Sequence, residues 1–294
     1  MAGVLSSLRY LFADILGDDD CARPYLPDGL SGTAALVVSD GIHLLMDYQG
    51  PSYAQLYVDR IRRFVGRPQV DDALLCEIAR LLAERMAYED PIRSAQLTLS
   101  ELQRNAAQRP PSRKPEPKKF RVDELVGALP ETAAEPLVMV CEKLGWMHRQ
   151  VSLRFPARSR VGVRCLKAGA GLRRWRLFSV RYEEERAWIE RWLHMIARCL
   201  DKQPAAAGAI VATATMVQGY GEAYRRGIAD WHAIIDGLVK PTFDGVLPID
   251  DLAGAVAEAR AAAMSDPRQV SLKRAIAQIR ARSLVAQPGA NAAE

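Results

Sequence analysis

The sequence predicts a mainly α-helical protein, a multi-helix, bundle-like fold with at most a small β element near residues 151–155. Three observations support this prediction. Apolar residues recur at three- and four-residue spacing in several segments, which is the period of an amphipathic helix. The stretch from Ala205 to Val217 is small and apolar, which suits a tightly packed central helix. Alternation of apolar and polar residues, the pattern of a strand, is brief and involves Val151, Leu153 and Phe155.

The N-terminal part of the chain divides into an irregular segment and a helical subdomain. Residues 1–33 are expected to be irregular, because their Asp, Pro and Gly clusters are typical of turns. The helical subdomain is expected over residues 34–107, with Gly50-Pro51 separating two of its helices. Asp71-Asp72 should begin another helix, since acidic residues favour a helix N-terminus. That helix should end near Asp90-Pro91, because proline disfavours helix at the residue before it.

Residues 108–119 form the clearest internal boundary. Prolines and basic residues dominate this stretch and no aliphatic or aromatic side chain occurs in it, as is typical of an exposed linker. The main helical domain is expected over residues 120–286, and a disordered tail over residues 287–294. Its clearest helix covers residues 183–200, where two tryptophans and several aliphatic residues share one face. Other helices are expected at 136–145, with Pro136 in the first turn, and at 250–264 and 271–286.

The composition is typical of a folded intracellular protein. Apolar residues make up 49% of the 294 residues, enough for a sizeable core. No apolar run approaches the length needed to cross a bilayer, so no membrane partner is expected. The N-terminus lacks the early positive charge of a signal peptide, and the five cysteines are widely spaced and odd in number. We therefore expect reduced thiols and a cytoplasmic location.

Positive charge is concentrated in the middle of the chain. The net charge is +5, and arginines crowd the stretch from Arg149 to Arg181. Such a patch favours an acidic protein surface, a phosphate-bearing ligand or nucleic acid as partner. The alternative interpretation is a solvated face, or arginines that pair with acidic helices of the same chain. The sequence leaves both interpretations open.

A glycine-rich stretch from Gly219 to Gly227 also has two interpretations. It contains three glycines and the pair Arg225-Arg226 within nine residues. Backbone N–H groups and arginines in such a segment can hold a phosphate. However, no strand precedes it and its spacing fits no known phosphate-binding fingerprint. The alternative is a tight helix–helix crossing, where glycines permit close contact and the arginines pair with carboxylates.

Four short blocks carry a family resemblance and occur in order along the chain. They are Asp47-Tyr48-Gln49 with Tyr53-Ala54; Arg85 to Asp90 with Ile92-Arg93; Leu172 to Arg176 with residues 183–193; and Val217 to Gly227. Together the blocks resemble the C-terminal, largely helical domain of the indolepyruvate ferredoxin oxidoreductase family. The resemblance covers about residues 34 to 265.

The resemblance implies a place in a thiamine-dependent 2-oxoacid:ferredoxin oxidoreductase. Relatives convert an arylpyruvate and coenzyme A to acyl-CoA, carbon dioxide and reduced ferredoxin. It implies that thiamine diphosphate, Mg and iron–sulfur clusters belong to partner subunits, including a gamma-type subunit. Because the resemblance begins near the start of this chain, we expect the accessory domain as a separate, auxiliary subunit. CoA or an aryl 2-oxoacid is a candidate ligand, and ferredoxin is expected to act through the complex.

The fourth block departs from the family pattern. Gln218 stands where relatives often have lysine, Glu222 where they have aspartate, and Ala223-Tyr224 where they have threonine and histidine. We therefore carry over no catalytic residue. The candidate ligand- or interface-binding residues are Gly219, Tyr220, Gly221, Glu222, Arg225, Arg226, Arg173, Arg174, Arg176, Tyr88, Glu89 and Asp90. Glu89 and Asp90 are expected to accept bonds from Arg93 or from the arginine cluster, in a network that fixes helix orientation.

The chain's own residues predict no cofactor or metal site. A thiamine site of this class needs Gly-Asp-Gly followed by an asparagine, and the chain contains only Asn105 and Asn291. The cysteines lie too far apart for a ferredoxin-type cluster, and the four histidines are isolated. One alternative is a stand-alone basic helical module that binds nucleic acid or an acidic protein, with Trp175 and Tyr182 available for stacking. Nucleic acid is disfavoured, because no known motif is present. A third interpretation, an independent enzyme acting on an acyl-CoA, lacks a nucleophile or base.

Overall fold

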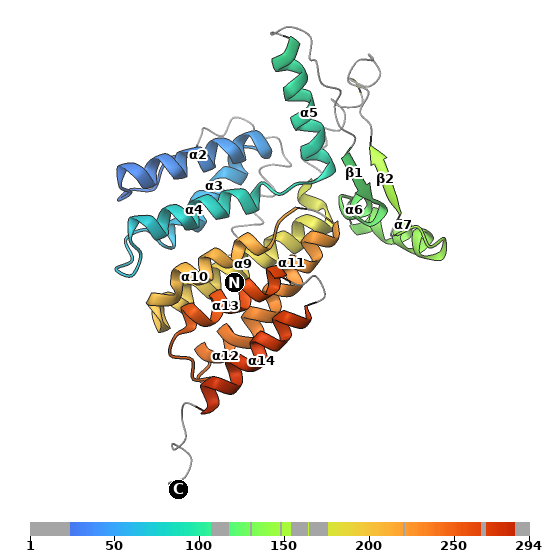
Figure 1. The fold of residues 1–294 in the computed structure, drawn as a ribbon. Coiled ribbons are helices and arrows are strands. Elements are labelled where there is room, and N and C mark those ends of the chain that lie inside the picture. The colour runs from blue at the N-terminus through green and yellow to red at the C-terminus, as the bar shows by residue number, and fades with distance from the viewer. Residues whose placement is uncertain are drawn as a thin grey trace. The chain divides into compact units, whose positions relative to one another are not determined.

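The computed structural model describes residues 24–106, 118–129, 131–147, 149–153, 164, 176–219, 221–265 and 269–285 (Figure 1). In this part of the chain the protein is mainly α-helical, as the sequence predicts. The strands described are two short ones. The irregular segment expected at residues 1–33 is described only from residue 24, and the tail at 287–294 lies outside the described residues. No described helix is both long enough and apolar enough to span a bilayer.

The chain forms two compact units, each assembled from separate stretches of sequence. The described residues of the first unit fall within 24–26, 39–60 and 83–188, and those of the second fall within 27–38, 61–82 and 189–285. Several helices therefore contribute residues to both units. The linker expected at 108–119 lies almost entirely outside the described residues.

Within residues 24–106, the structure describes four helices: α2 (Gly32–Tyr48), α3 (Pro51–Arg62), α4 (Asp72–Met86) and α5 (Pro91–Ala106). The predicted break between the first two is confirmed, and Gly50 adopts a φ of 148°, which favours glycine. The predicted start of α4 is also confirmed, because Asp71 Oδ1 accepts the Leu74 N–H at 2.8 Å as an N-cap. Helix α4 ends four residues earlier than predicted, and Asp90 instead caps α5 by accepting the Arg93 N–H.

The β element lies beside two short helices, α6 (Val122–Gly127) and α7 (Glu131–Lys143). Strand β2 (Gln150–Leu153) matches the predicted alternation and pairs antiparallel with β1 (Lys118–Arg121), with Phe120 opposite Val151. The predicted linker extends through Lys118 and Lys119, but these residues belong to β1, so the end of the linker is wrong; a four-residue strand has no distinct pattern. The placement of Pro136 in a first helical turn is wrong, since α7 begins five residues earlier and Pro136 lies inside it.

The C-terminal part begins with α9 (Val180–Lys202), whose predicted apolar face is buried. It continues through α10 (Ala207–Ala212), α11 (Gly221–Ile234), a π-helical turn (Ile235–Val239), α12 (Lys240–Phe243), α13 (Leu252–Ser265) and α14 (Val270–Val285). The single helix expected over 205–217 is wrong, because α10 is flanked by two 3₁₀ turns. Thr213 and Thr215 hydroxyls donate to the carbonyls of Ile210 and Ala212 at 2.6 and 2.8 Å, so these side chains compete for acceptors in the last helical turn.

Candidate functional site

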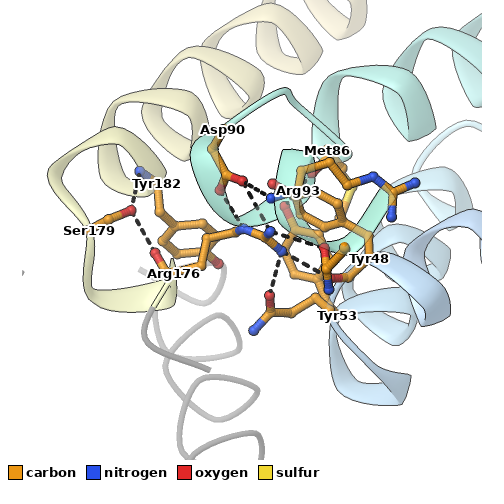
Figure 2. Close-up of polar contacts among 10 residues, drawn as sticks. Tyr48, Tyr53, Met86, Asp90, Arg93, Arg176, Ser179 and Tyr182 are labelled. Carbon is orange, nitrogen blue, oxygen red and sulfur yellow. Dashed lines mark hydrogen bonds and ion pairs between the residues drawn. The ribbon is translucent and has the colours of Figure 1, made fainter. Parts of the chain in front are cut away.

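The first unit is organised around the buried side chain of Arg176, which precedes α9 and is 1% exposed. Its Nε and Nη2 donate to the two carboxylate oxygens of Asp90, at 2.5 and 3.2 Å. Its Nη1 donates to the Tyr48 carbonyl at 2.9 Å and to Gln49 Oε1 at 3.1 Å, and Nη2 also donates to Gln96 Oε1 at 3.3 Å (Figure 2). These five bonds match the five N–H donors of a guanidinium.

Two of the acceptors, Tyr48 and Asp90, lie at helix ends. Tyr48 is the last residue of α2, where carbonyls without an intrahelical partner and the helix dipole favour a cation. Asp90 is fixed by its capping bond to the Arg93 N–H at the start of α5. Burial by itself lowers the pKa of Arg176, but Tyr48 and Asp90 raise it above its ordinary value. The guanidinium therefore stays charged, and its N–H donors bond to acceptors of the same chain.

Four tyrosines surround this ion pair. The Tyr48 ring centroid lies 6.0 Å from that of Tyr53 and 5.8 Å from that of Tyr88, and Tyr53 lies 6.2 Å from Tyr182. The Arg176 guanidinium carbon sits 3.9 Å from the Tyr48 centroid, within cation–π range. Burial raises the pKa of Tyr48, Tyr53 and Tyr88, so their hydroxyls remain protonated at neutral pH. The cluster shapes the core of this unit.

A second buried ion-pair group lies in the same unit. Arg85 of α4 and Arg181 of α9 both donate to Glu185 Oε1, at 3.2 and 2.9 Å. The Glu185 side chain is 2% exposed, so it is almost completely withdrawn from water. Arg85 also lies over the Trp188 ring, with its guanidinium carbon 5.5 Å from the centroid. The Arg85–Glu185 ion pair joins α4 to α9, and the Arg181–Glu185 pair lies within α9.

The glycine-rich stretch lies in the second unit and has a packing role at one position. A Cβ added to Gly227 would come within 2.2 Å of the Met216 carbonyl oxygen, so only glycine permits this approach of α11 to the preceding turn. Gly219 has a φ of +72°, and Gly221 begins α11. The close approach supports a packing role for Gly227, although its contact is with the 3₁₀ turn at Thr213–Met216 and its end rather than with a second α-helix. Glu222, Arg225 and Arg226 are exposed on α11, and the charge of Arg226 acts on Asp230, whose pKa burial raises.

The structure thus brings together three of the predicted candidates, Tyr88, Asp90 and Arg176. The expected bond between Asp90 and the arginine cluster is present through Arg176, and the bond from Arg93 to Asp90 is donated by its backbone N–H. Glu89 is exposed and makes no bond to the arginine cluster among the described residues. Arg173, Arg174 and Tyr220 lie outside the described residues. Tyr182, considered for nucleic-acid stacking, is buried at 8% exposure.

Several partners in these groups escaped sequence reasoning. Three of them, Gln49, Arg85 and Glu185, lie inside the blocks that carry the resemblance. Their place in a block is the feature of the sequence that could have identified them. Gln96 lies outside the blocks, and no sequence pattern identifies it as a partner of Arg176. Within the described ranges, no three His, Cys, Asp or Glu side chains gather in a way that could hold a metal ion.

Comparison with known proteins identifies one family. A family described as "Family of unknown function (DUF6537)" matches residues 34–237, from α2 to the π-helical turn. No curated protein and no solved structure matches the chain. The matched segment contains the Arg176 network, the Glu185 group and the glycine-rich stretch, and it covers more than half of the sequence. The chain therefore belongs to the DUF6537 family.

Proposed function

We propose that this chain is an auxiliary subunit or domain of an arylpyruvate-type 2-oxoacid:ferredoxin oxidoreductase. The complex would convert a 2-oxoacid and CoA to acyl-CoA, carbon dioxide and reduced ferredoxin. Thiamine diphosphate, Mg and the iron–sulfur clusters would be bound by partner subunits, one of them of the gamma type. The chain would supply shape and positive charge, organising partner subunits or covering part of the substrate or CoA entrance. The proposal rests on the four sequence blocks.

One observation carries the proposed role. Three of the four blocks that resemble the oxidoreductase domain meet in a single buried network: Tyr48 and Gln49 from the first, Asp90 from the second and Arg176 from the third. These residues form hydrogen bonds with one another, as expected of residues that stabilise a fold. The residues that define the resemblance therefore favour a structural role in an auxiliary subunit over a reaction centre in this chain.

Some members of the candidate set lie on the surface, where we expect partner subunits to contact them. Arg225 and Arg226 lie on the surface of α11, and Glu89 is exposed just before α5. Charged side chains at the rim of an interface mainly affect association rate and its salt dependence. We therefore expect the double change Arg225→Gln and Arg226→Gln to weaken association with the partner subunits while the chain still folds.

Co-purification tests the proposal directly. The chain is isolated from its native source under mild conditions, and the accompanying proteins are identified by mass spectrometry. Thiamine-binding and gamma-type subunits are expected, and arylpyruvate oxidation with CoA and ferredoxin should depend on adding the chain back to the depleted complex. The purified chain alone should be colourless and inactive. A brown preparation with a cluster absorbance band, or binding of oligonucleotides that weakens steeply with salt and no co-purifying subunits, would reject the proposal.

A further inference from the structure

A partly exposed charged cluster in the second unit has no part in the proposed function. Arg191 of α9 donates from Nη1 to His232 Nδ1 of α11 at 2.8 Å, and from Nη2 to Asp236 Oδ1. Asp236 lies in the π-helical turn that follows α11, and its Oδ2 is 3.9 Å from His232 Nδ1. The three side chains are 36% to 48% exposed, so protons from solvent reach them.

The arrangement fixes which nitrogen of His232 carries the proton. A guanidinium has five N–H donors and no acceptor, so the ring nitrogen that faces Arg191 must accept. His232 Nδ1 therefore presents a lone pair, and the neutral ring carries its hydrogen on Nε2. A second proton can enter only at Nδ1, the atom that holds Arg191.

We propose that Arg191, His232 and Asp236 form an acid-sensitive latch between α9 and the end of α11. Protonation of His232 Nδ1 removes the acceptor for Arg191 and places two positive charges side by side. Asp236 Oδ2 lies 3.9 Å from Nδ1, so a small shift of the protonated ring exchanges its arginine partner for a carboxylate partner. The latch is closed with neutral histidine and open with charged histidine, and it does not depend on the proposed function.

The charges around His232 set the direction of the response. Burial lowers its pKa, Arg191 from α9 lowers it further, and Asp236 from the π-helical turn opposes them. The Trp231 ring, 5.1 Å away between centroids, adds an apolar neighbour without a charge. Because the folded pKa lies below the unfolded value near 6.5, the latch stabilises the fold fully above that pH. The stabilisation is lost as pH falls through the folded pKa.

The position of Asp236 connects the latch to packed structure. The π-helical turn that contains it also contains Ile235, Leu238 and Val239, which are all 0% exposed. π-Helical turns within α-helices often occur at functional sites. A change of partner at Asp236 therefore acts on a segment whose neighbouring residues belong to the core of this unit.

Nitrogen-detected NMR of the histidine rings in the full chain tests the latch. At pH 7.5, His232 should show the tautomer with hydrogen on Nε2, and it should titrate below 6.5. Arg191→Gln should raise the midpoint of its titration, and Asp236→Asn should lower it. Arg198→Gln is the matched control, since it removes another α9 arginine–aspartate pair, with Asp244 at 2.7 Å, away from His232. Hydrogen on Nδ1 at pH 7.5, or equal titrations in Arg191→Gln and Arg198→Gln, would overturn the proposal.

Hydrogen exchange measures the structural consequence. Amides of α11 and the π-helical turn should exchange faster at pH 5.5 than at pH 7.5, after correction for the intrinsic pH dependence. His232→Gln keeps an acceptor for Arg191 but takes up no proton, so this variant should show no such difference. Equal protection of wild type at the two pH values, or the same acid response in His232→Gln, would show that the cluster is only a static surface contact.

Discussion

Arg176 and Asp90 lie 86 residues apart in the sequence and form a two-bond ion pair with 1% and 6% of their side-chain surfaces exposed. The pair joins the segment before α9 to the start of α5 (Figure 2). A buried ion pair often adds little net stability relative to apolar residues, because both charges lose their hydration. Breaking one half is different, since the remaining charge is left buried without its partner.

Asp90→Asn should therefore destabilise the protein by about 3–5 kcal/mol. Asparagine keeps the size and one acceptor but leaves the Arg176 charge without a carboxylate. Glu89→Gln makes the same chemical change at the adjacent, exposed position and should alter stability by less than about 0.5 kcal/mol. Urea unfolding followed by circular dichroism compares the two. Equal effects of the two substitutions would mean that the ion pair does not hold this unit together.

Two tyrosines in the same cluster should respond differently to loss of the hydroxyl. Tyr53 Oη donates to the Met86 carbonyl at 3.0 Å, so Tyr53→Phe should cost about 0.5–1.5 kcal/mol. Tyr48 Oη is buried and has no hydrogen-bond partner within the described part of the chain. Tyr48→Phe should then leave stability unchanged or raise it slightly. Measured free energies of unfolding test this difference, and a larger loss of stability in Tyr48→Phe than in Tyr53→Phe would contradict the prediction.

The buried tyrosines also predict a stability loss at alkaline pH. Burial raises the pKa of Tyr48, Tyr53 and Tyr88 in the folded state, whereas an unfolded tyrosine ionises near 10. The unfolded chain therefore releases these protons first, and stability is lost as pH rises above about 10. Tyrosinate absorbance at alkaline pH should show a delayed group that appears together with loss of the circular dichroism signal. Ionisation of all tyrosines before unfolding would contradict the burial.

Gly227→Ala should destabilise the second unit by about 1–3 kcal/mol, because the added methyl group collides with the backbone of the Met216 turn. Gly208, in α10, is the control, since a Cβ there meets no atom within 4 Å. Gly208→Ala should stabilise the protein by about 0.4–1 kcal/mol through the unfolded chain. Thermal unfolding of both variants tests whether the two substitutions change stability in opposite directions. A harmless Gly227→Ala would exclude the close crossing.

Local sequence was sufficient for most helices. The break at Gly50-Pro51, the start of α4 and the buried face of α9 follow from glycine and proline geometry, capping acids and apolar periodicity, all of which act over a few residues. The same reasoning failed at α10, where the threonine hydroxyls of the following turn interrupt an otherwise helical composition. It also failed for β1, because a strand is stabilised by a partner that its own sequence does not contain.

The sequence by itself determined the fold class, and it located an acidic motif and an arginine cluster that were expected to interact. Only the tertiary structure decided which arginine meets Asp90, that Glu89 stays in solvent, and that Gln49 and Gln96 complete the set of acceptors. The same holds for Arg191 and His232, 41 residues apart. The physical reason is that helix formation depends on neighbours in the chain, whereas the partners of a buried charge are chosen by how helices pack.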